Sequence, residues 1–230
     1  LFWRSMTQWI GGLGFVILSL AIMPFIGGDF NMFSAETTGP IQDKMQPRIK
    51  ETAKRLWGLY LFLTLLESLF LWIGGMDYFD AICHSLTTLA TGGMSTKPMS
   101  IGTWDSPFIH YTVILFMIIG GTNFTLIYYA LIKQRFDKLF RDEEFKFYIL
   151  FVSLATLVIA FVIFFISPQY GTVEKTFRDS LFHVTSIITT TGFSTTNYMT
   201  WPSLTWLILI LLMVTGACSG STTGGIKIAR

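Results

Sequence analysis

The sequence predicts an all-α membrane protein built from repeated units, each made of a spanning helix, a short re-entrant helix and a second spanning helix. Three observations support this fold class. Of the 230 residues, 52% are hydrophobic and only 13% are charged, against about 25% charged residues in ordinary soluble domains. Five apolar stretches are long enough to cross all or most of a bilayer, and two shorter segments repeat each other in register. This composition excludes a cytosolic enzyme, a disordered region and a disulfide scaffold.

The five apolar stretches are predicted as helices, because backbone polar groups in lipid must find hydrogen-bond partners within their own segment. A helix needs about 20 apolar residues to cross the hydrocarbon core. Four of the stretches carry no charged residue, and the second carries one, Glu67. In chain order they are Ser5–Gly28, Leu56–Met76, Phe108–Ile132, Phe147–Ile166 and Trp201–Ile226.

The distribution of lysine and arginine predicts the orientation of these spans. The connections between the first and second spans and between the third and fourth hold ten such residues, and the opposite side holds four. Basic loops remain on the cytoplasmic side of a membrane. The connections 29–55 and 134–146 are therefore predicted to be cytoplasmic. Within the second, the charge-mixed stretch Arg135–Glu144 is expected to form a solvated turn or to contact a partner subunit.

Two short segments on the other side align without a gap at an offset of 99 residues. Each has about 12 residues of helical pattern, too short to cross, followed by a Thr-Gly segment; they begin at Phe79 and Arg178. Glycines interrupt the spans at corresponding places, Gly11-Gly12, Gly120-Gly121 and Gly216, so the chain repeats one supersecondary unit. The identical pairs are Asp80 and Asp179, His84 and His183, Thr91 and Thr190, Gly93 and Gly192, Ser95 and Ser194, and Thr96 and Thr195.

This repeat predicts the organisation of the chain. The range 1–28 is the last helix of a first unit, 56–133 is a complete second unit and 147–230 is a third unit without its end, with 29–55 and 134–146 as the connections. We expect an internal piece of a longer protein, since the chain starts at Leu1 and its last residues restart an apolar pattern.

The Thr-Gly segments predict an ion pore. A re-entrant segment places irregular backbone at membrane depth, which is tolerated only where it is buried in protein or lines a watery cavity. Glycine reaches backbone conformations closed to other residues, and a ring of carbonyls can replace the water shell of a dehydrated cation. The re-entrant helices would direct their negative C-terminal ends at that cation, with Asp80 and Asp179 at the favourable N-terminal ends. One such segment alone is more often a plain turn.

The stretch Thr190-Thr191-Gly192-Phe193-Ser194 resembles the degenerate potassium-filter sequence of the Trk/Ktr/HKT superfamily of potassium transporters. Stretches along the whole chain are similar to the bacterial Trk-type membrane subunit: Trp9–Gly14, Ala35–Pro40, Pro47–Ile49, Gly75-Met76, Asp80-Ala81, Thr91–Gly93 and Gly216–Lys227. The resemblance implies four repeats around one pore and an activity of potassium uptake. This chain would hold the last helix of the first repeat, all of the second and most of the third.

The resemblance also implies which residues form the filter. It places one filter strand in each of the two repeats, with the potassium ion as the transported substrate. The strands would consist of Thr91, Gly92, Gly93 and Met94, and of Thr190, Thr191, Gly192 and Phe193. Potassium would be held at Thr91, Gly92, Thr190 and Thr191.

The Gly-rich break in the fifth stretch is implied to be an intramembrane gating loop below the filter. It holds four glycines in ten positions, and each costs a helix about 1 kcal/mol relative to alanine. Close packing of helices through small residues is the alternative interpretation. The loop would consist of Gly216, Ala217, Cys218, Ser219, Gly220, Ser221, Thr222, Thr223, Gly224 and Gly225.

Other polar residues have more than one expected role. Glu67, a charge inside a span, is a candidate for the ion pathway or for a supporting pair. Lys227 is expected either at the cytoplasmic pore mouth or extended to the membrane interface. His84 and His183 are expected to pack as neutral residues behind the filter, with a cation-site or pH-sensing role as the alternative. The two cysteines, Cys83 and Cys218, give no disulfide framework. No cluster of His, Cys, Asp and Glu has metal-ligand spacing.

The resemblance further implies a multi-pass protein of the inner (plasma) membrane that contacts lipid and forms a homodimer. Its cytosolic partner would be a nucleotide-binding regulatory subunit of the TrkA kind. No organic cofactor, nucleic-acid partner or enzymatic activity is expected. The alternative is an intramembrane serine hydrolase that pairs Ser219 or Ser221 with His183. Neither serine lies in a Gly-x-Ser-x-Gly motif, which argues against the hydrolase hypothesis.

Overall fold

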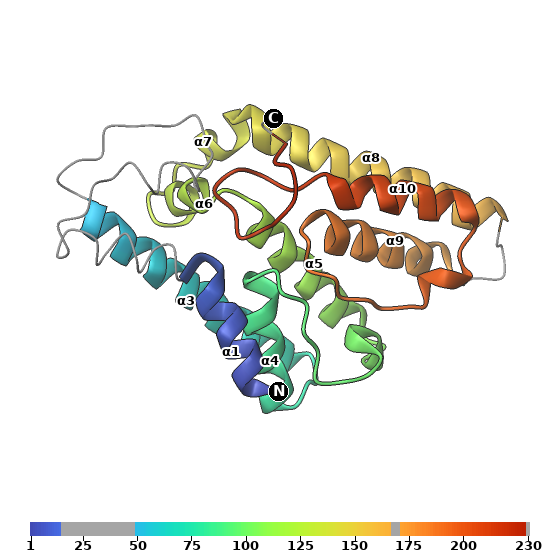
Figure 1. The fold of residues 1–230 in the computed structure, drawn as a ribbon, viewed down its shortest axis with the longest axis horizontal. Coiled ribbons are helices and arrows are strands. Elements are labelled where there is room, and N and C mark those ends of the chain that lie inside the picture. Colours follow the sequence, from blue (N-terminus) through green and yellow to red (C-terminus); the bar gives the residue numbers. More distant parts are fainter. Residues whose placement is uncertain (15–48, 167–170, 229–230) are drawn as a thin grey trace.

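The computed structural model describes residues 1–14, 49–166 and 171–228, and the regular structure in these ranges is helical (Figure 1). The first helix, α1, spans Phe2–Trp9 and continues into the π-type turn η1, Ile10–Gly14. Short 3-10 turns cover Ser100–Thr103 and Tyr198–Thr200. The further helices are α3 Ile49–Ile73, α4 Tyr78–Leu89, α5 Pro107–Gly121, α6 Phe124–Leu131, α7 Phe136–Arg141, α8 Glu143–Ile166, α9 Val173–Ile188 and α10 Ser203–Val214.

The helices form two similar groups, as the repeat predicts. In the first group α4 packs against α3, and in the second α9 packs against α8 and α10. Helix α5 contacts both short helices, α4 and α9, and so joins the two groups in the middle of the molecule (Figure 1). The short helices α4 and α9 contain the two segments predicted to be re-entrant, and most of their residues are buried.

Two helices are long and apolar enough to cross a membrane in the described part of the chain, Lys54–Ile73 of α3 and Glu143–Ile166 of α8. Both carry apolar residues on all sides. On α8, for example, Tyr148 and Val152 are buried while Leu150 and Leu154 are exposed. A helix that is hydrophobic all round needs lipid against its outer face. The chain is therefore an all-α membrane protein.

The third apolar stretch is not one straight span. It forms α5 and α6, which meet at an angle of 112° directly after Gly120-Gly121. Thr122 is extended there, and the side chain of Asn123 caps α6 by accepting a hydrogen bond from the Thr125 N–H at 2.9 Å. The predicted glycine interruption is confirmed, and the bend follows because the chain leaves the helical conformation at that point.

The fifth apolar stretch is also shorter as a helix than its composition suggests. Helix α10 has 12 residues and ends at Val214, where Thr215 becomes extended. Residues 215–228 form a loop, as the glycine content predicts. In the first stretch, Gly12 leaves the helical conformation with a ψ of −134°. Most of that stretch, most of the connection 29–55, and the motifs Ala35–Pro40 and Pro47-Arg48 lie outside the described residues.

Several boundaries differ from the sequence prediction; α3, for example, begins at Ile49 and α8 at Glu143, both inside the predicted connections. The stretch Arg135–Glu144, expected as a solvated turn, contains the short helix α7, with its residues mostly exposed. Helix α9 begins five residues before Arg178, because Thr172 caps it by accepting a hydrogen bond from the Lys175 N–H at 3.3 Å.

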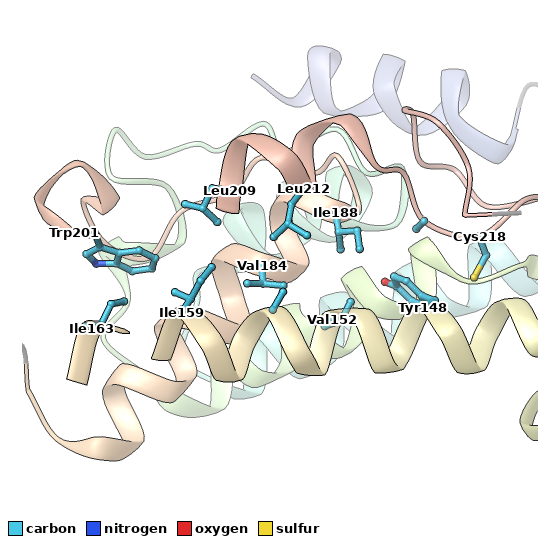
Figure 2. Packing of buried hydrophobic residues seen from close by; sticks show 12 residues of the cluster. Tyr148, Val152, Ile159, Ile163, Val184, Ile188, Trp201, Leu209, Leu212 and Cys218 are labelled. Carbon is cyan, nitrogen blue, oxygen red and sulfur yellow. The ribbon is translucent and has the colours of Figure 1, made fainter. Parts of the chain in front are cut away.

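The core that supports the second group lies between α8, α9 and α10. Figure 2 shows Val184 and Ile188 of α9 between the apolar faces of α8 and α10. Ala217 and Cys218, from the Gly-rich loop, belong to the same buried cluster. The loop is therefore anchored in the hydrophobic core at its beginning, and its later residues extend toward the ends of α4 and α9.

Candidate ion filter and gate loop

The two predicted filter strands leave their short helices in the same conformation. We call Thr91–Met94 the first filter loop and Thr190–Phe193 the second. Thr91 has a φ of 51° and Thr190 a φ of 55°, values that are uncommon for residues other than glycine. Two positions later Gly93 and Gly192 again have positive φ values, 68° and 84°. Each loop thus needs a conformation that its glycine permits.

Each filter loop is held against its own helix by the same pair of hydrogen bonds. The Gly92 N–H donates to the Thr87 carbonyl at 2.8 Å, and the Thr191 N–H donates to the Ser186 carbonyl at 2.9 Å. The side chains of the same two helix residues also donate outward. The Thr87 hydroxyl lies 3.1 Å from both the Met94 carbonyl and the His84 carbonyl of its own helix, and the Ser186 hydroxyl bonds to the Phe193 carbonyl at 2.7 Å. Residues that are 99 positions apart in the sequence therefore make equivalent contacts in the two repeats.

The fold brings the two filter loops together. A Cβ atom added to Gly93 would lie 1.7 Å from the Thr191 carbonyl oxygen, so only glycine fits between the loops. Beyond the filter, the Gly102 N–H donates to the Ser194 carbonyl at 3.1 Å, and the Ser194 N–H donates to the Ser100 hydroxyl at 3.3 Å. Two segments separated by about a hundred residues thus share one site, as a common pore requires.

The two histidines lie behind the filter loops. Each bonds through Nδ1 to the carbonyl four residues earlier, His84 to Asp80 at 2.7 Å and His183 to Asp179 at 2.9 Å. A carbonyl only accepts, so Nδ1 carries the proton in both rings. The His84 Nε2 lies 2.9 Å from the Ser95 hydroxyl. The ring of Phe193, from the second filter loop, lies 5.7 Å from the His84 ring, so the second filter loop packs against the short helix of the first repeat.

The aspartates at the start of the short helices have different partners. Asp80 forms an ion pair with Lys97 at 3.2 Å. Asp179 accepts a hydrogen bond from the Thr195 hydroxyl at 3.0 Å. Lys97 aligns with the uncharged Thr196 at the offset of 99 residues. The ion pair of Asp80 therefore has no counterpart at that position in the second repeat, although the two aspartates are equivalent.

The Gly-rich segment Gly216–Gly225, here called the gate loop, is closed at its base. The Gly216 N–H donates to the Ile226 carbonyl at 2.7 Å, and the Ile226 N–H donates to the Val214 carbonyl at 3.2 Å. A Cβ atom on Gly216 would lie 2.3 Å from the Gly224 carbonyl oxygen, so the base closes only with glycine. Close packing of a helix through small residues is not observed, because no helix covers the described residues 215–228.

The far part of the gate loop bonds to the start of both filter loops. The Thr91 hydroxyl lies 3.0 Å from the Thr222 carbonyl and 2.8 Å from the Ala90 carbonyl, so it donates to either, and the Gly224 N–H donates to the Thr190 hydroxyl at 2.9 Å. The Thr222 hydroxyl lies 3.0 Å from the Leu89 carbonyl and 3.2 Å from the Gly120 carbonyl. The loop therefore lies directly beneath both predicted filter strands.

The gate loop also fills the bend between α5 and α6. The Cys218 N–H donates to the Gly121 carbonyl at 3.1 Å, and the Phe124 N–H donates to the Gly220 carbonyl at 3.3 Å. These are backbone groups that a continuous helix would have paired internally. The backbone groups that are left without helical partners at the α5–α6 bend are therefore paired by backbone groups of the gate loop.

Lys227 contacts the gate loop that precedes it. Its ammonium turns back into the gate loop, donates to the Thr223 carbonyl, and lies 2.9 Å from the Thr223 hydroxyl and 3.4 Å from the Ser221 hydroxyl. Glu67 is fully buried in α3 and lies against Thr88 of α4. It therefore contacts a short helix, α4.

Two residues at this site were not predicted from the sequence. The Gln8 amide of α1 donates to the Gly92 carbonyl at 3.3 Å. Glu144, at the start of α8, bonds to Ser219 of the gate loop through its carboxylate. A polar residue in the first apolar stretch could have indicated Gln8, but nothing in the local sequence distinguishes Glu144 from its neighbour Glu143.

The site lacks the features of the alternative chemistries. Among the described residues, no three His, Cys, Asp or Glu side chains come close enough to hold a metal ion. His183 packs against Tyr198 and Trp201, while Ser219 bonds to Glu144 and Ser221 bonds to the Cys218 carbonyl. The structure therefore gives no support to a Ser–His pair.

Comparison with known proteins agrees with this geometry. A family model described as the cation transport protein TrkH matches residues 1–230. The Trk system potassium uptake protein TrkH of Escherichia coli (strain K12) is 42% identical over 233 residues, covering 100% of this chain and 48% of the relative. TrkG of the same strain is 34% identical over 232 residues, covering 100% and 47%.

A solved structure is similar over the same range. The crystal structure of the potassium transporter TrkH from Vibrio parahaemolyticus matches with a TM-score of 0.83 and 36% sequence identity, covering 100% of this chain and 46% of that one. The chain thus spans about half the length of the relatives that it matches.

Proposed function

Because the chain belongs to the TrkH family of cation transport proteins, we propose that it supplies two filter strands and the gate loop of a potassium uptake pore. The observation that carries the proposal is the bonding of one loop to the first threonine of both filter loops. A segment in that position must move before an ion can leave the filter toward the cytoplasm. The relatives are named as transport proteins, so a transporter and not an enzyme is proposed.

In this proposal the two filter loops present backbone and hydroxyl oxygens to a dehydrated potassium ion. Thr91 and Gly92, with Thr190 and Thr191, are the proposed ligands. The helix hydroxyls that bond to Met94 and Phe193 fix the upper part of each loop. Pre-set carbonyls of this kind let the ion exchange its water shell without rearranging the protein.

The remaining assignments follow from the family and from the exposed surfaces. We propose the divisions 56–133 and 147–230 as the second and third of four repeats, with 1–28 as the end of the first. The whole protein is proposed to be a multi-pass inner-membrane homodimer. A cytosolic nucleotide-binding subunit of the TrkA kind is proposed to act from the side of α7, which lies within the connection 134–146 and whose residues are mostly exposed.

The first test is potassium-dependent growth of cells that lack their own potassium uptake systems and carry the full-length parent gene. We expect rescue by the wild type and a raised potassium requirement with Gly192→Ser, because a side chain is strained at a φ of 84°. Gly58→Ser is the matched control, since a Cβ atom at Gly58 meets nothing within 4 Å and its φ is not positive.

Expression of each protein is compared by immunoblot of the membranes. Equal rescue by wild type and Gly192→Ser would remove Gly192 from the filter. Loss of rescue by Gly58→Ser as well would mean that the assay reports on folding, and direct rubidium uptake by purified protein would then replace it.

A further inference from the structure

One charged side chain reaches the gate loop from another part of the fold. Glu144 lies in the first turn of α8, 75 residues before Ser219 in the chain. Its Oε1 accepts a hydrogen bond from the Ser219 N–H at 2.6 Å. The Ser219 hydroxyl lies 2.9 Å from Oε1 and 2.7 Å from Oε2, so it donates to either oxygen. Both the backbone and the side chain of Ser219 are therefore held by one carboxylate.

The other contacts of the gate loop are of a different kind. In the described part of the chain, the loop's remaining partners outside itself are backbone groups of the α5–α6 bend, of Leu89, Ile226 and Ile228, two threonine hydroxyls and the Lys227 ammonium. Apart from Lys227, which follows the loop almost directly in the chain, all of these are neutral. Hydrogen bonds to an ionised group are roughly twice as strong as neutral ones. The bonds to Glu144 are thus a charged attachment of the loop to a separate helix, α8.

Glu144 links the gate loop to the junction of α7 and α8, in the connection predicted to be cytoplasmic. Helix α7 ends at Arg141, and α8 begins at Glu143 after one extended residue. Helix α7 packs against α8, and none of its residues is buried. Any force applied to α7 therefore reaches the first turn of α8, and with it the carboxylate that holds Ser219.

We propose that Glu144 is a latch, a positioning residue that keeps the gate loop bonded to Thr91 and Thr190. Displacement of the first turn of α8 withdraws the carboxylate and frees the loop. The term gate rests on the proposed pore function, but the attachment of the loop to Glu144 does not. Regulation of the pore then requires only a small movement at the α7–α8 junction.

The chain contains its own reporter for this movement. Cys218 precedes Ser219 and is 1% exposed, so a thiol reagent reaches it only when the loop leaves its place. Cys83, in α4, is 0% exposed and reports unfolding of the surrounding helices. In purified full-length protein, the labelling rate of each cysteine by a water-soluble maleimide is measured by mass spectrometry of the two peptides.

Three variants separate the latch from other effects. Glu144→Gln removes the charge that accepts both bonds, and Ser219→Ala removes the hydroxyl while leaving the charge near the Cys218 thiol unchanged. Glu143→Gln is the matched control, since Glu143 is adjacent and exposed and loses the same charge. We expect Cys218 to be labelled about tenfold faster in Glu144→Gln, as expected for loss of a charged hydrogen bond. Ser219→Ala should be faster by a smaller factor, and Glu143→Gln should match the wild type.

The same preparations in liposomes give rubidium uptake, which should be highest for Glu144→Gln. Wild-type labelling of Cys218 in both Glu144→Gln and Ser219→Ala overturns the latch. Faster labelling without any increase in flux, in a protein whose wild type conducts, overturns its role in gating. Faster labelling with no uptake by any form, wild type included, supports the latch and rejects the pore. If Cys83 is also labelled faster in Glu144→Gln, the decision passes to Ser219→Ala, where unchanged Cys218 labelling again overturns the latch.

Discussion

Alanine at the two equivalent filter glycines should have unequal effects on transport. Gly192 has a φ of 84°, and a Cβ atom added to it meets nothing within 4 Å. Its substitution by alanine therefore costs only backbone strain, about 1–2 kcal/mol for a left-handed conformation, which corresponds to a factor of about 5–30 in an equilibrium. Gly93 carries a similar strain at a φ of 68°, but its Cβ atom would lie 1.7 Å from the Thr191 carbonyl oxygen.

The close contact at Gly93 makes its substitution by alanine more costly than that of Gly192. Real Cβ atoms essentially never approach a neighbour closer than 3.0 Å, so the two filter loops must separate by at least 1.3 Å, the difference between 3.0 Å and 1.7 Å. Thr191 is one of the proposed potassium ligands, and displacing a positioned group by about 1 Å costs roughly a hundredfold in the reaction that it serves. We expect Gly192→Ala to keep part of its transport and Gly93→Ala to lose nearly all of it.

Rubidium uptake by the full-length variants in liposomes measures this difference, with sodium competition as the readout of selectivity. Gly58→Ala is the control, because a Cβ atom at Gly58 meets nothing within 4 Å. Equal uptake by Gly93→Ala and wild type would refute the contact between the filter loops. A greater loss in Gly192→Ala than in Gly93→Ala would refute the argument from packing.

Three further predictions concern the groups around the filter. Deleting Gly216–Gly225 in the full-length protein should raise rubidium flux and loosen its regulation, because both filter threonines lose their bonds to the loop; unchanged flux would mean that the segment only fills space. Lys227→Met should raise basal flux in the same assay, since the ammonium that joins Thr223 and Ser221 is lost, whereas Lys227→Arg should stay nearer to wild type. Gln8→Ala should cost about 1 kcal/mol at the Gly92 carbonyl, measured as a modest fall in rubidium affinity; an unchanged affinity would show that Gln8 does not position that carbonyl.

The local structure of the filter loops could be predicted from the sequence because the determinants are local. The identical threonines and glycines at the offset of 99 residues follow helices of the same kind, and they adopt the same φ values and bond to the same helix positions. The differences between the two repeats are also local. Lys97 stands where the other repeat has the uncharged Thr196, and so Asp80 forms an ion pair at that position and Asp179 does not.

The angle and the partners of the helix breaks could not be predicted in this way. Gly120-Gly121 indicates a break but not a bend of 112°, because the angle is set by the gate-loop groups that bond to Gly121 and Phe124 from a hundred residues away. Glu143 and Glu144 are indistinguishable in the sequence. Only the packing of α8 against the loop turns one toward Ser219 and leaves the other exposed.

The geometry finally indicates how the gate and the filter depend on each other. The last carbonyls of a helix have no partner within it and carry the negative end of its dipole. One of these, the Leu89 carbonyl of α4, bonds to the Thr222 hydroxyl of the gate loop at 3.0 Å. In the proposed pore, departure of the loop exposes that carbonyl, and water or a cation then replaces the hydroxyl. The exchange of one neutral hydrogen bond for another costs only about 0.5–1.5 kcal/mol. The proposed latch therefore assigns the stability of the closed loop mainly to its charged contacts, those of Glu144 with Ser219 and of Lys227 with Thr223.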